Sequence, residues 1–272
     1  MSRIAWNKKM TDLDEQNIIK WYIKDNLTTK EILNKLNKFK TSKTITDILH
    51  KYNIPIKEKW EFIDINHSAF DKIETEAQAY FLGLLTADGW VQEKTNGIGI
   101  QLIHTDIDIL KDLALFLHIE ISKIKTYYPS DSIIKGKILH RSPAARLVWH
   151  SPWMKKHLAK YGVINKKSKR EWLPYLNEKL MRHYLRGFLD GDGTICATNI
   201  GTTHIKFIGS KTMCDQIKQF LYYKLNISIP KTSAGIGIHG VTWAKQHEIE
   251  ILIPYLWKDI SHCLNRKNPY EN

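Results

Sequence analysis

The first sixty residues contain three short runs in which apolar side chains recur every three or four positions. The runs cover residues 18–23, 32–36 and 45–52. This spacing predicts three amphipathic helices. Thr11 with Asp14 and Thr28 with Glu31 have the spacing of helix N-caps. Pro55 ends the third run, because proline disfavours helix in the residue before it.

The second and third predicted helices, joined by the basic and polar turn 37–42, resemble a helix-turn-helix. In that arrangement the third helix enters the major groove of DNA, with Lys43, Thr44 and Thr46 near its leading end. The alternative is a helical bundle used for packing or protein contacts. The basic turn favours DNA binding. We therefore predict a DNA-binding domain over residues 1–60 and a linker over residues 61–74.

Beyond residue 75 one order of elements occurs twice. In the first copy we predict strands at 90–91, 97–102, 133–139 and 145–150 and helices at 106–117 and 153–161. In the second copy we predict strands at 194–195, 203–207, 227–229 and 236–243 and helices after Ser210 and at 246–257. Each copy is an αββαββα unit of the α+β class. The two halves are placed at 75–165 and 166–272.

Each half opens with an apolar nine-residue string, FLGLLTADG at 81–89 and LRGFLDGDG at 185–193. Glycine inside a helix costs about 1 kcal/mol relative to alanine, yet Gly83 and Gly187 occupy the same place in both strings. Ala87 and Gly191 follow one helical turn later. These small residues predict that the two helices pack against each other and form the interface between the halves.

Each string ends in an aspartate and a glycine. Asp88 and Asp192 would lie at helix C-termini, where the helix dipole is already negative. Gly89 and Gly193 are expected to adopt the left-handed conformation that ends a helix. Two acids brought together in this way favour a divalent cation between them. The alternative is that each acid only caps its helix or pairs with a lysine.

The chain has 41 basic and 28 acidic residues, a net charge of +13, which favours a polyanionic partner. No apolar stretch approaches the roughly 20 residues that span a bilayer, and the N-terminus lacks the apolar core of a signal peptide. Three scattered cysteines match no zinc or disulfide pattern. We expect a protein of the cytoplasm or an organelle, not a secreted or membrane protein. Polar residues of the sheet regions are the candidate DNA contacts: Gln101, Lys135, Lys137, Arg141, His204, Lys206, Lys211 and His239.

At the two strings the chain resembles the LAGLIDADG homing endonucleases in their single-chain, two-motif form. The second string is the closer match, and in the first Thr86 replaces the usual first aspartate. The stretch 158–174 also resembles the segment that joins the two halves in this family. The resemblance covers residues 75–265 and leaves the N-terminal region outside.

The resemblance implies a saddle of two antiparallel sheets over a long, specific duplex site, bound by a monomer with internal pseudo-two-fold symmetry. It implies that Asp88 and Asp192 bind Mg²⁺, which Mn²⁺ can replace, near the scissile phosphates. By the same resemblance Lys245 and His150 are the candidate basic catalytic residues, and Thr105 and Ser210 could position water. It also implies intron or intein mobility. The alternatives are a DNA-binding regulator without nuclease activity, an RNA-binding intron maturase and a nicking enzyme.

Overall fold

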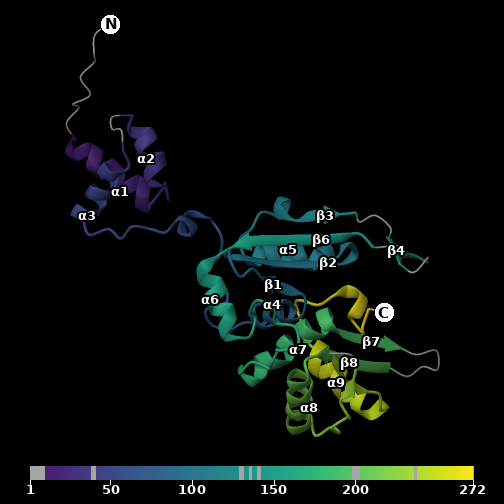
Figure 1. Ribbon diagram of the computed structural model, residues 1–272. Helices are drawn as coiled ribbons and strands as arrows, with labels where there is room; N and C mark the ends of the chain where they lie inside the picture. The colour runs from purple at the N-terminus through teal and green to yellow at the C-terminus, as the bar shows by residue number, and fades with distance from the viewer. Residues whose placement is uncertain are drawn as a thin grey trace. The chain divides into compact units, whose positions relative to one another are not determined.

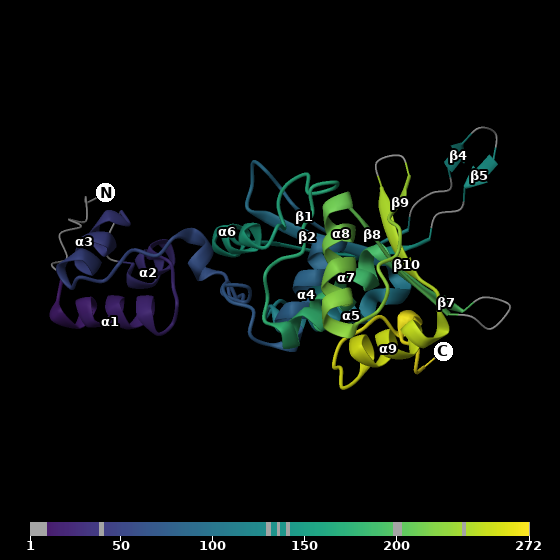
Figure 2. The same cartoon turned by 90° about the horizontal axis from the view of Figure 1, so that it is seen from below.

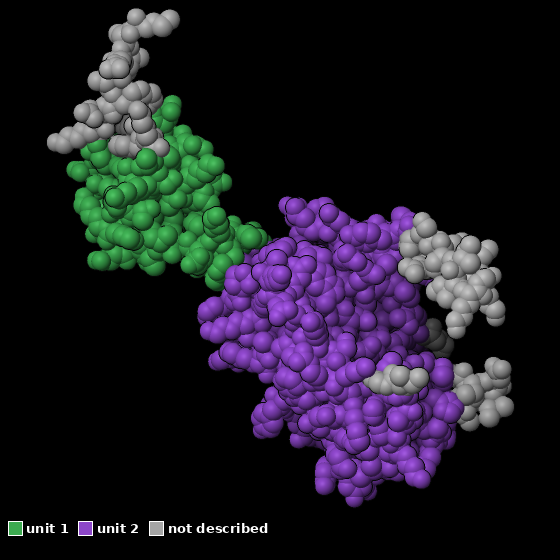
Figure 3. All heavy atoms as spheres, viewed as in Figure 1, with its two compact units in different colours: residues 1–64 green, residues 65–272 purple. Residues whose placement is uncertain are grey.

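The chain forms two compact units, Met1–Asp64 and Ile65–Asn272 (Figure 3). The computed structural model describes residues 10–37, 41–128, 132–134, 137–139, 142–197, 203–235 and 238–271. Among the helices of these residues, none is long and apolar enough to cross a membrane.

The first unit is a small helical domain. It contains α1 (Asp12–Ile23), α2 (Thr29–Leu36), α3 (Lys43–Lys51) and the 3₁₀ turn η1 (Lys59–Phe62). The three helices and both predicted caps are confirmed, because Thr11 and Thr28 each form a reciprocal capping box with the acid three residues later. Apolar side chains from all three helices make a core of its own: Ile18, Tyr22, Ile32, Ile45 and Leu49.

The segment after α3 packs back onto α1. The backbone N–H of Lys57 donates to the Tyr22 hydroxyl at 2.6 Å, and the Phe62 ring meets the Tyr22 ring edge-on at 5.7 Å. The domain therefore includes this segment, and its last residue is Asp64.

The second unit contains the two predicted halves (Figure 1). The first half comprises α4 (Glu76–Ala87), β1 (Gly89–Val91), β2 (Gly97–Ile103), η2 (His104–Asp106), α5 (Ile107–Phe116), η3 (Ile121–Lys123), β3 (Lys125–Tyr127), β4 (Ser132–Ile134), β5 (Lys137–Leu139), β6 (Ala144–His150) and α6 (Pro152–Lys160). The second comprises α7 (Glu178–Asp192), β7 (Gly193–Ala197), β8 (Thr203–Gly209), α8 (Lys211–Leu225), β9 (Ser233–Ala234), β10 (His239–Trp243), α9 (Gln246–Trp257) and η4 (Asn265–Lys267).

Each half has a four-stranded antiparallel sheet, and the two sheets have matching strand orders. The orders are β1-β2-β6-β3 and β7-β8-β10-β9. Helix α8 packs on β8 and β10, and α5 packs on β2 and β6 (Figure 2). The predicted α+β class with two pseudo-symmetric halves is confirmed.

Two predicted strands are wrong. Residues 133–139 form not one strand of the main sheet but the short pair β4 and β5, and β3 takes the edge position instead. Residues 227–229 form no strand. There Ser228 N–H donates to Glu248 and Ser228 C=O accepts from the Trp243 indole, so side chains replace the ladder partners.

The motif helices α4 and α7 cross in close contact at the predicted glycines. A methyl group added to Gly83 would lie 2.1 Å from the Tyr184 carbonyl oxygen, and one added to Gly187 would lie 2.0 Å from that of Tyr80. One turn later, a methyl group on Gly191 would lie 2.3 Å from Ala87 Cβ. Backbone therefore contacts backbone across the pseudo-dyad, and α4 and α7 lie between the two sheets (Figure 1).

The left-handed conformation predicted for Gly89 and Gly193 is wrong. Gly193 has φ −129° and ψ 178°, which is extended, and within the described chain Gly162 is the glycine with positive φ. Both glycines instead begin strands that turn back on their own helices. A methyl group would lie 2.5 Å from the Leu85 carbonyl oxygen at Gly89 and 2.7 Å from that of Leu189 at Gly193. Glycine is required at both positions because a larger side chain does not fit, and not because of the backbone φ angle.

Candidate functional site

The two motif acids lie at the adjoining C-terminal ends of α4 and α7. Asp88 follows α4 and Asp192 is the last residue of α7. A methyl group on Gly191 would lie 2.9 Å from Asp88 Oδ2, so the Asp88 carboxylate rests against the residue before Asp192. Burial raises the pKa of Asp88 to about 6, and the charge of Asp192 adds to the rise. Burial also raises the pKa of Asp192.

A buried lysine binds the end of each motif helix. Lys167 Nζ donates to Ala87 O at 2.5 Å, at the end of α4. Lys267 Nζ donates to Leu189 O, Asp190 O and Gly193 O at 2.9, 2.6 and 2.7 Å, at the end of α7. Both ammonium groups offset the negative ends of the helix dipoles. Both also lower the pKa values of the two aspartates.

The lysines are carried by the segments that follow the last helix of each half. The C-terminal segment is tied to the first half through Ser261 N–H on Glu76 at 2.8 Å and Arg266 on Asp106 at 2.9 Å. The segment after α6 is tied to the second half through the Ser210 hydroxyl, which donates to Glu171 O at 2.6 Å. The C-terminal segment therefore packs on the first half, at the start of α5. The segment after α6 packs on the second half, at the start of α8.

A third acid lies beside this site. Glu171 is 6% exposed, and its Oε2 has no hydrogen-bond partner among the described residues. Burial lowers the pKa of Lys167, and the charge of Glu171 opposes that change. The charge of Glu171 also adds to the raised pKa of Asp192. Arg266, held by Asp106, lowers the pKa of Asp88.

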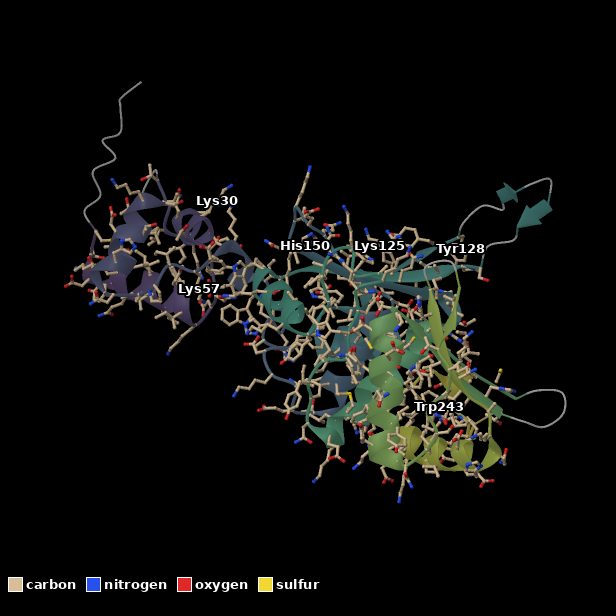
Figure 4. The ribbon with its side chains drawn as sticks, turned by 60° about the horizontal axis from the view of Figure 1, so that its bottom comes forward. Lys30, Lys57, Lys125, Tyr128, His150 and Trp243 are labelled. Atoms are coloured by element: carbon tan, nitrogen blue, oxygen red, sulfur yellow. The ribbon has the colours of Figure 1, made fainter. Side chains whose placement is uncertain are left out.

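The predicted basic residues Lys245 and His150 lie near the ends of β10 and β6. Lys245 is the N-cap residue of α9, and its exposed Nζ is 3.8 Å from Glu248. His150 is the exposed last residue of β6, paired with Gly97 (Figure 4). The strand registers place Leu147 and Val241 at equivalent positions of the two sheets. His150, three residues after Leu147, therefore corresponds to Ala244 and not to Lys245.

Sequence reasoning missed Lys167 and Lys267, although the chain carries a signal for them. Lys167 follows Asp88 by 79 residues and Lys267 follows Asp192 by 75, and each has a glutamate four residues later, Glu171 or Glu271. The signal is weak because 34 lysines are spread over the chain.

The other predicted residues are spread over the two units. Ser210 caps α8 and accepts from Met213 N–H, and Thr105 lies in η2. Gln101 accepts two hydrogen bonds from Arg146, and Lys211 pairs with Asp215 at 2.6 Å. The remaining ones are placed as follows: Lys43, Thr44 and Thr46 on α3, His204 and Lys206 on β8, His239 on β10, and Lys137 on β5 with its side chain outside the description. Lys135 and Arg141 lie outside the described residues.

The two motif carboxylates suit a divalent metal ion that takes its remaining ligands from water and a phosphate. Among the described residues no group of three or more histidine, cysteine or acidic side chains could hold a metal. Asp88 and Asp192 supply two carboxylates. Mg²⁺ commonly takes one or two carboxylates and completes its shell with water and phosphate oxygens.

Part of the chain resembles a curated protein sequence. No family model matches the chain. An uncharacterised protein of Methanocaldococcus jannaschii is 30% identical over 168 residues, which are 60% of this chain and 59% of that protein. The chain thus spans about three fifths of the length of this curated relative.

Among solved structures, the homing endonuclease I-WcaI bound to its DNA recognition sequence matches with a TM-score of 0.52 at 10% identity, over 80% of this chain and 96% of that one. The LAGLIDADG homing endonuclease I-SmaMI bound to cleaved DNA matches with a TM-score of 0.46 at 13% identity, over 73% and 87%. The N-terminal LAGLIDADG domain of DUF199/WhiA matches with a TM-score of 0.44 at 11% identity, over 72% and 91%. The match to I-WcaI and the matching strand orders of the two sheets show that the second unit has the two-half LAGLIDADG fold.

Proposed function

We propose that this protein is a site-specific, metal-dependent double-stranded DNA endonuclease. The observation that carries the proposal is the pair of half-buried acids, Asp88 and Asp192, at the adjoining ends of the two motif helices, with a buried lysine bound to each helix end. Acids with raised pKa values gathered at one point are typical of catalytic sites, and DNA binding alone does not require them. The net charge of +13 and the DNA-bound neighbour I-WcaI support duplex DNA as the substrate.

In the proposed reaction, Asp88 and Asp192 hold Mg²⁺ together with a scissile phosphate. A metal held there would supply Lewis-acid chemistry: it would polarise the phosphate and lower the pKa of the attacking water. The carboxylates must be ionised to bind it, and the neighbouring ammonium groups of Lys167 and Lys267 favour that ionised state.

The two lysines differ in the hydrogen bonds that they can still donate. Within the described part of the chain, Lys267 donates three hydrogen bonds to carbonyl groups, whereas Lys167 donates one. An ammonium group has three donors in all. Lys167 therefore keeps two donors for a phosphate or a water, and its charge offsets the charge that develops on the phosphate. Lys267 serves to hold the end of α7.

The test is incubation of the full chain with a randomised duplex library, with and without Mg²⁺, followed by sequencing of the ends. We expect defined cut ends that need Mg²⁺ and disappear with a chelator. Asp88→Asn and Asp192→Asn should each lower cleavage by at least about 100-fold, because each removes a metal ligand. Both should bind DNA at least as tightly as the parent, because each removes a negative charge.

The matched control is Asp108→Asn, which neutralises an exposed acid on α5 that pairs with Lys111. It should cut like the parent. Full cleavage by the Asp88→Asn, Asp192→Asn double variant would refute the nuclease proposal.

A DNA-binding regulator without nuclease activity is the second candidate. It draws support from the separate three-helix unit, in which Lys43 lies exposed at the start of α3. Enrichment of a sequence without cut ends in the same experiment would favour it. Preference for a structured RNA over the duplex would favour a maturase, and a cut in one strand alone would favour a nicking enzyme.

A further inference from the structure

One row of side chains on the outer face of the first-half sheet combines charge with fixed geometry. The strand registers place Gln101 of β2, Arg146 of β6 and Lys125 of β3 side by side. Their neighbours along the strands, such as Ile100, Leu102 and Leu147, are buried in the core. The row therefore points away from the core, because successive residues of a strand face opposite sides.

The guanidinium of Arg146 is held in place by two neighbours. Nε and Nη2 both donate to Gln101 Oε1, at 2.9 and 2.5 Å. The guanidinium carbon also lies 4.7 Å from the centre of the Tyr127 ring. An arginine side chain that is not held in place loses conformational entropy when it binds a ligand. Because these contacts already fix Arg146, binding costs it less entropy.

The contacts leave one edge of the guanidinium available. Gln101 takes one hydrogen from Nε and one from Nη2, and the fork made by Nη1 and the second Nη2 hydrogen has no partner in the described residues. Two parallel donors of this kind match the O6 and N7 acceptors of guanine in the major groove, and also a phosphate.

Position on the sheet favours guanine over phosphate. Arg146 lies on β6, which has a neighbouring strand on each side. Lys125, labelled in Figure 4, lies on the edge strand β3. If this face of the sheet lies in the major groove, a central strand is nearer the base edges than an edge strand is, and contacts to base edges carry sequence specificity. These positions suit Lys125 to a phosphate contact and Arg146 to a base contact.

On the described strands of the second half, no arginine occupies the equivalent place. Leu147 and Val241 occupy equivalent places in the two registers, so Arg146 corresponds to Gly240 and its row to Ile208, Gly240 and Ser233. A guanine preference from this row can arise in one half-site only.

We propose that Arg146, held by Gln101 and Tyr127, reads a guanine in the half-site that the first half of the protein covers. The inference rests on the DNA binding of the proposed function and not on cleavage. It names a specificity-determining residue that lies on the sheet, away from the two motif acids.

The test is a binding selection with the full chain and a randomised duplex library in the presence of a chelator. The parent should enrich guanine at a position in one half-site. Arg146→Ala should lose that preference while the other positions stay unchanged, and should bind the guanine duplex 10- to 100-fold more weakly. Arg146→Lys keeps the charge but not the fork, so it should lose the guanine preference and keep most of the affinity for other duplexes.

Lys125→Ala is the matched control. It should weaken binding to all duplexes alike and reduce the salt dependence of the affinity by about one phosphate contact. The inference is overturned if Arg146→Ala keeps the guanine preference, if it behaves like Lys125→Ala, or if the parent binds a defined site without guanine. Absence of any selected sequence for the parent would instead refute site-specific DNA binding, and with it the proposed function.

Discussion

Single residues at the crossing of α4 and α7 set how closely the two halves approach. We predict that Gly187→Ala lowers the free energy of unfolding by about 3 kcal/mol or more. The added methyl group would lie 2.0 Å from the Tyr80 carbonyl oxygen, which is rigid helix backbone. The loss should occur although alanine is the better helix former by about 1 kcal/mol. Urea denaturation measures the change.

Gly235→Ala is the control for this substitution. Among the described residues, the nearest atom to a methyl group added at Gly235 is the Ile238 carbonyl oxygen at 3.5 Å, an ordinary contact. Its free energy of unfolding should stay within about 0.5 kcal/mol of the parent. Equal denaturation midpoints for Gly187→Ala and the parent would show that the helices do not touch there.

A buried histidine next to this interface makes stability depend on pH. Burial lowers the pKa of His183 from 6.5 to about 4, and the charge of Arg186 at 3.1 Å adds to the shift. The unfolded chain therefore binds a proton between these values that the folded chain does not. His183 should contribute its full stability above about pH 6.5 and lose up to about 3 kcal/mol as the pH falls to 4.

The measurement is the free energy of unfolding at several pH values for the parent and His183→Gln. The variant cannot titrate at this position, so its curve should be flatter between pH 6.5 and 4. Parallel curves would contradict the prediction, whatever the absolute stability of the variant.

At the scale of elements, the mismatch between the two motif copies has a structural reason. Thr86 and Asp190 occupy the same place in α4 and α7. The Thr86 hydroxyl donates to Leu82 O within its own helix at 2.8 Å. Asp190 accepts from the Tyr80 hydroxyl of the other motif helix at 2.7 Å and from Leu264 N–H of the C-terminal segment at 2.9 Å. Asp190 thus fastens the segment that carries Lys267.

We therefore predict unequal effects for the two alanine substitutions. Asp190→Ala leaves a buried hydroxyl and a buried N–H without an acceptor and should cost about 2–4 kcal/mol of stability. Thr86→Ala removes a bond to a carbonyl in its own helix and should cost less than about 1 kcal/mol. Chemical denaturation of both variants decides this, and equal losses would show that Asp190 does not fasten the C-terminal segment.

At the scale of the whole molecule, the chain has two cores without shared residues. Ile18 belongs to the core of the first unit and Leu110 to that of the second, and both are fully buried. We expect two thermal transitions. Ile18→Ala should lower the midpoint temperature of one transition, and Leu110→Ala that of the other. Each substitution should lower the free energy of unfolding of its own unit by about 2–5 kcal/mol. A single transition that both variants shift together would show that the units unfold as one.

The local part of this structure could be predicted from the sequence. The caps at Thr11 and Thr28 form hydrogen bonds over three residues, so a few neighbouring residues determine each of them. The motif repeat likewise predicted that α4 and α7 approach at Gly83 and Gly187. Small residues at a constant spacing in both copies require only that two like helices pair.

The tertiary structure alone decided which side chains surround the two aspartates. Lys167 binds a carbonyl 80 residues away, and Ser261 binds Glu76 across 185 residues. No local periodicity encodes such pairs, because they depend on where the segments after α6 and α9 end. The same holds for Gly89 and Gly193, whose need for space arises only once each strand folds back on its helix. Sequence by itself determined the two halves and their acids, and tertiary packing decided the charges that act on them.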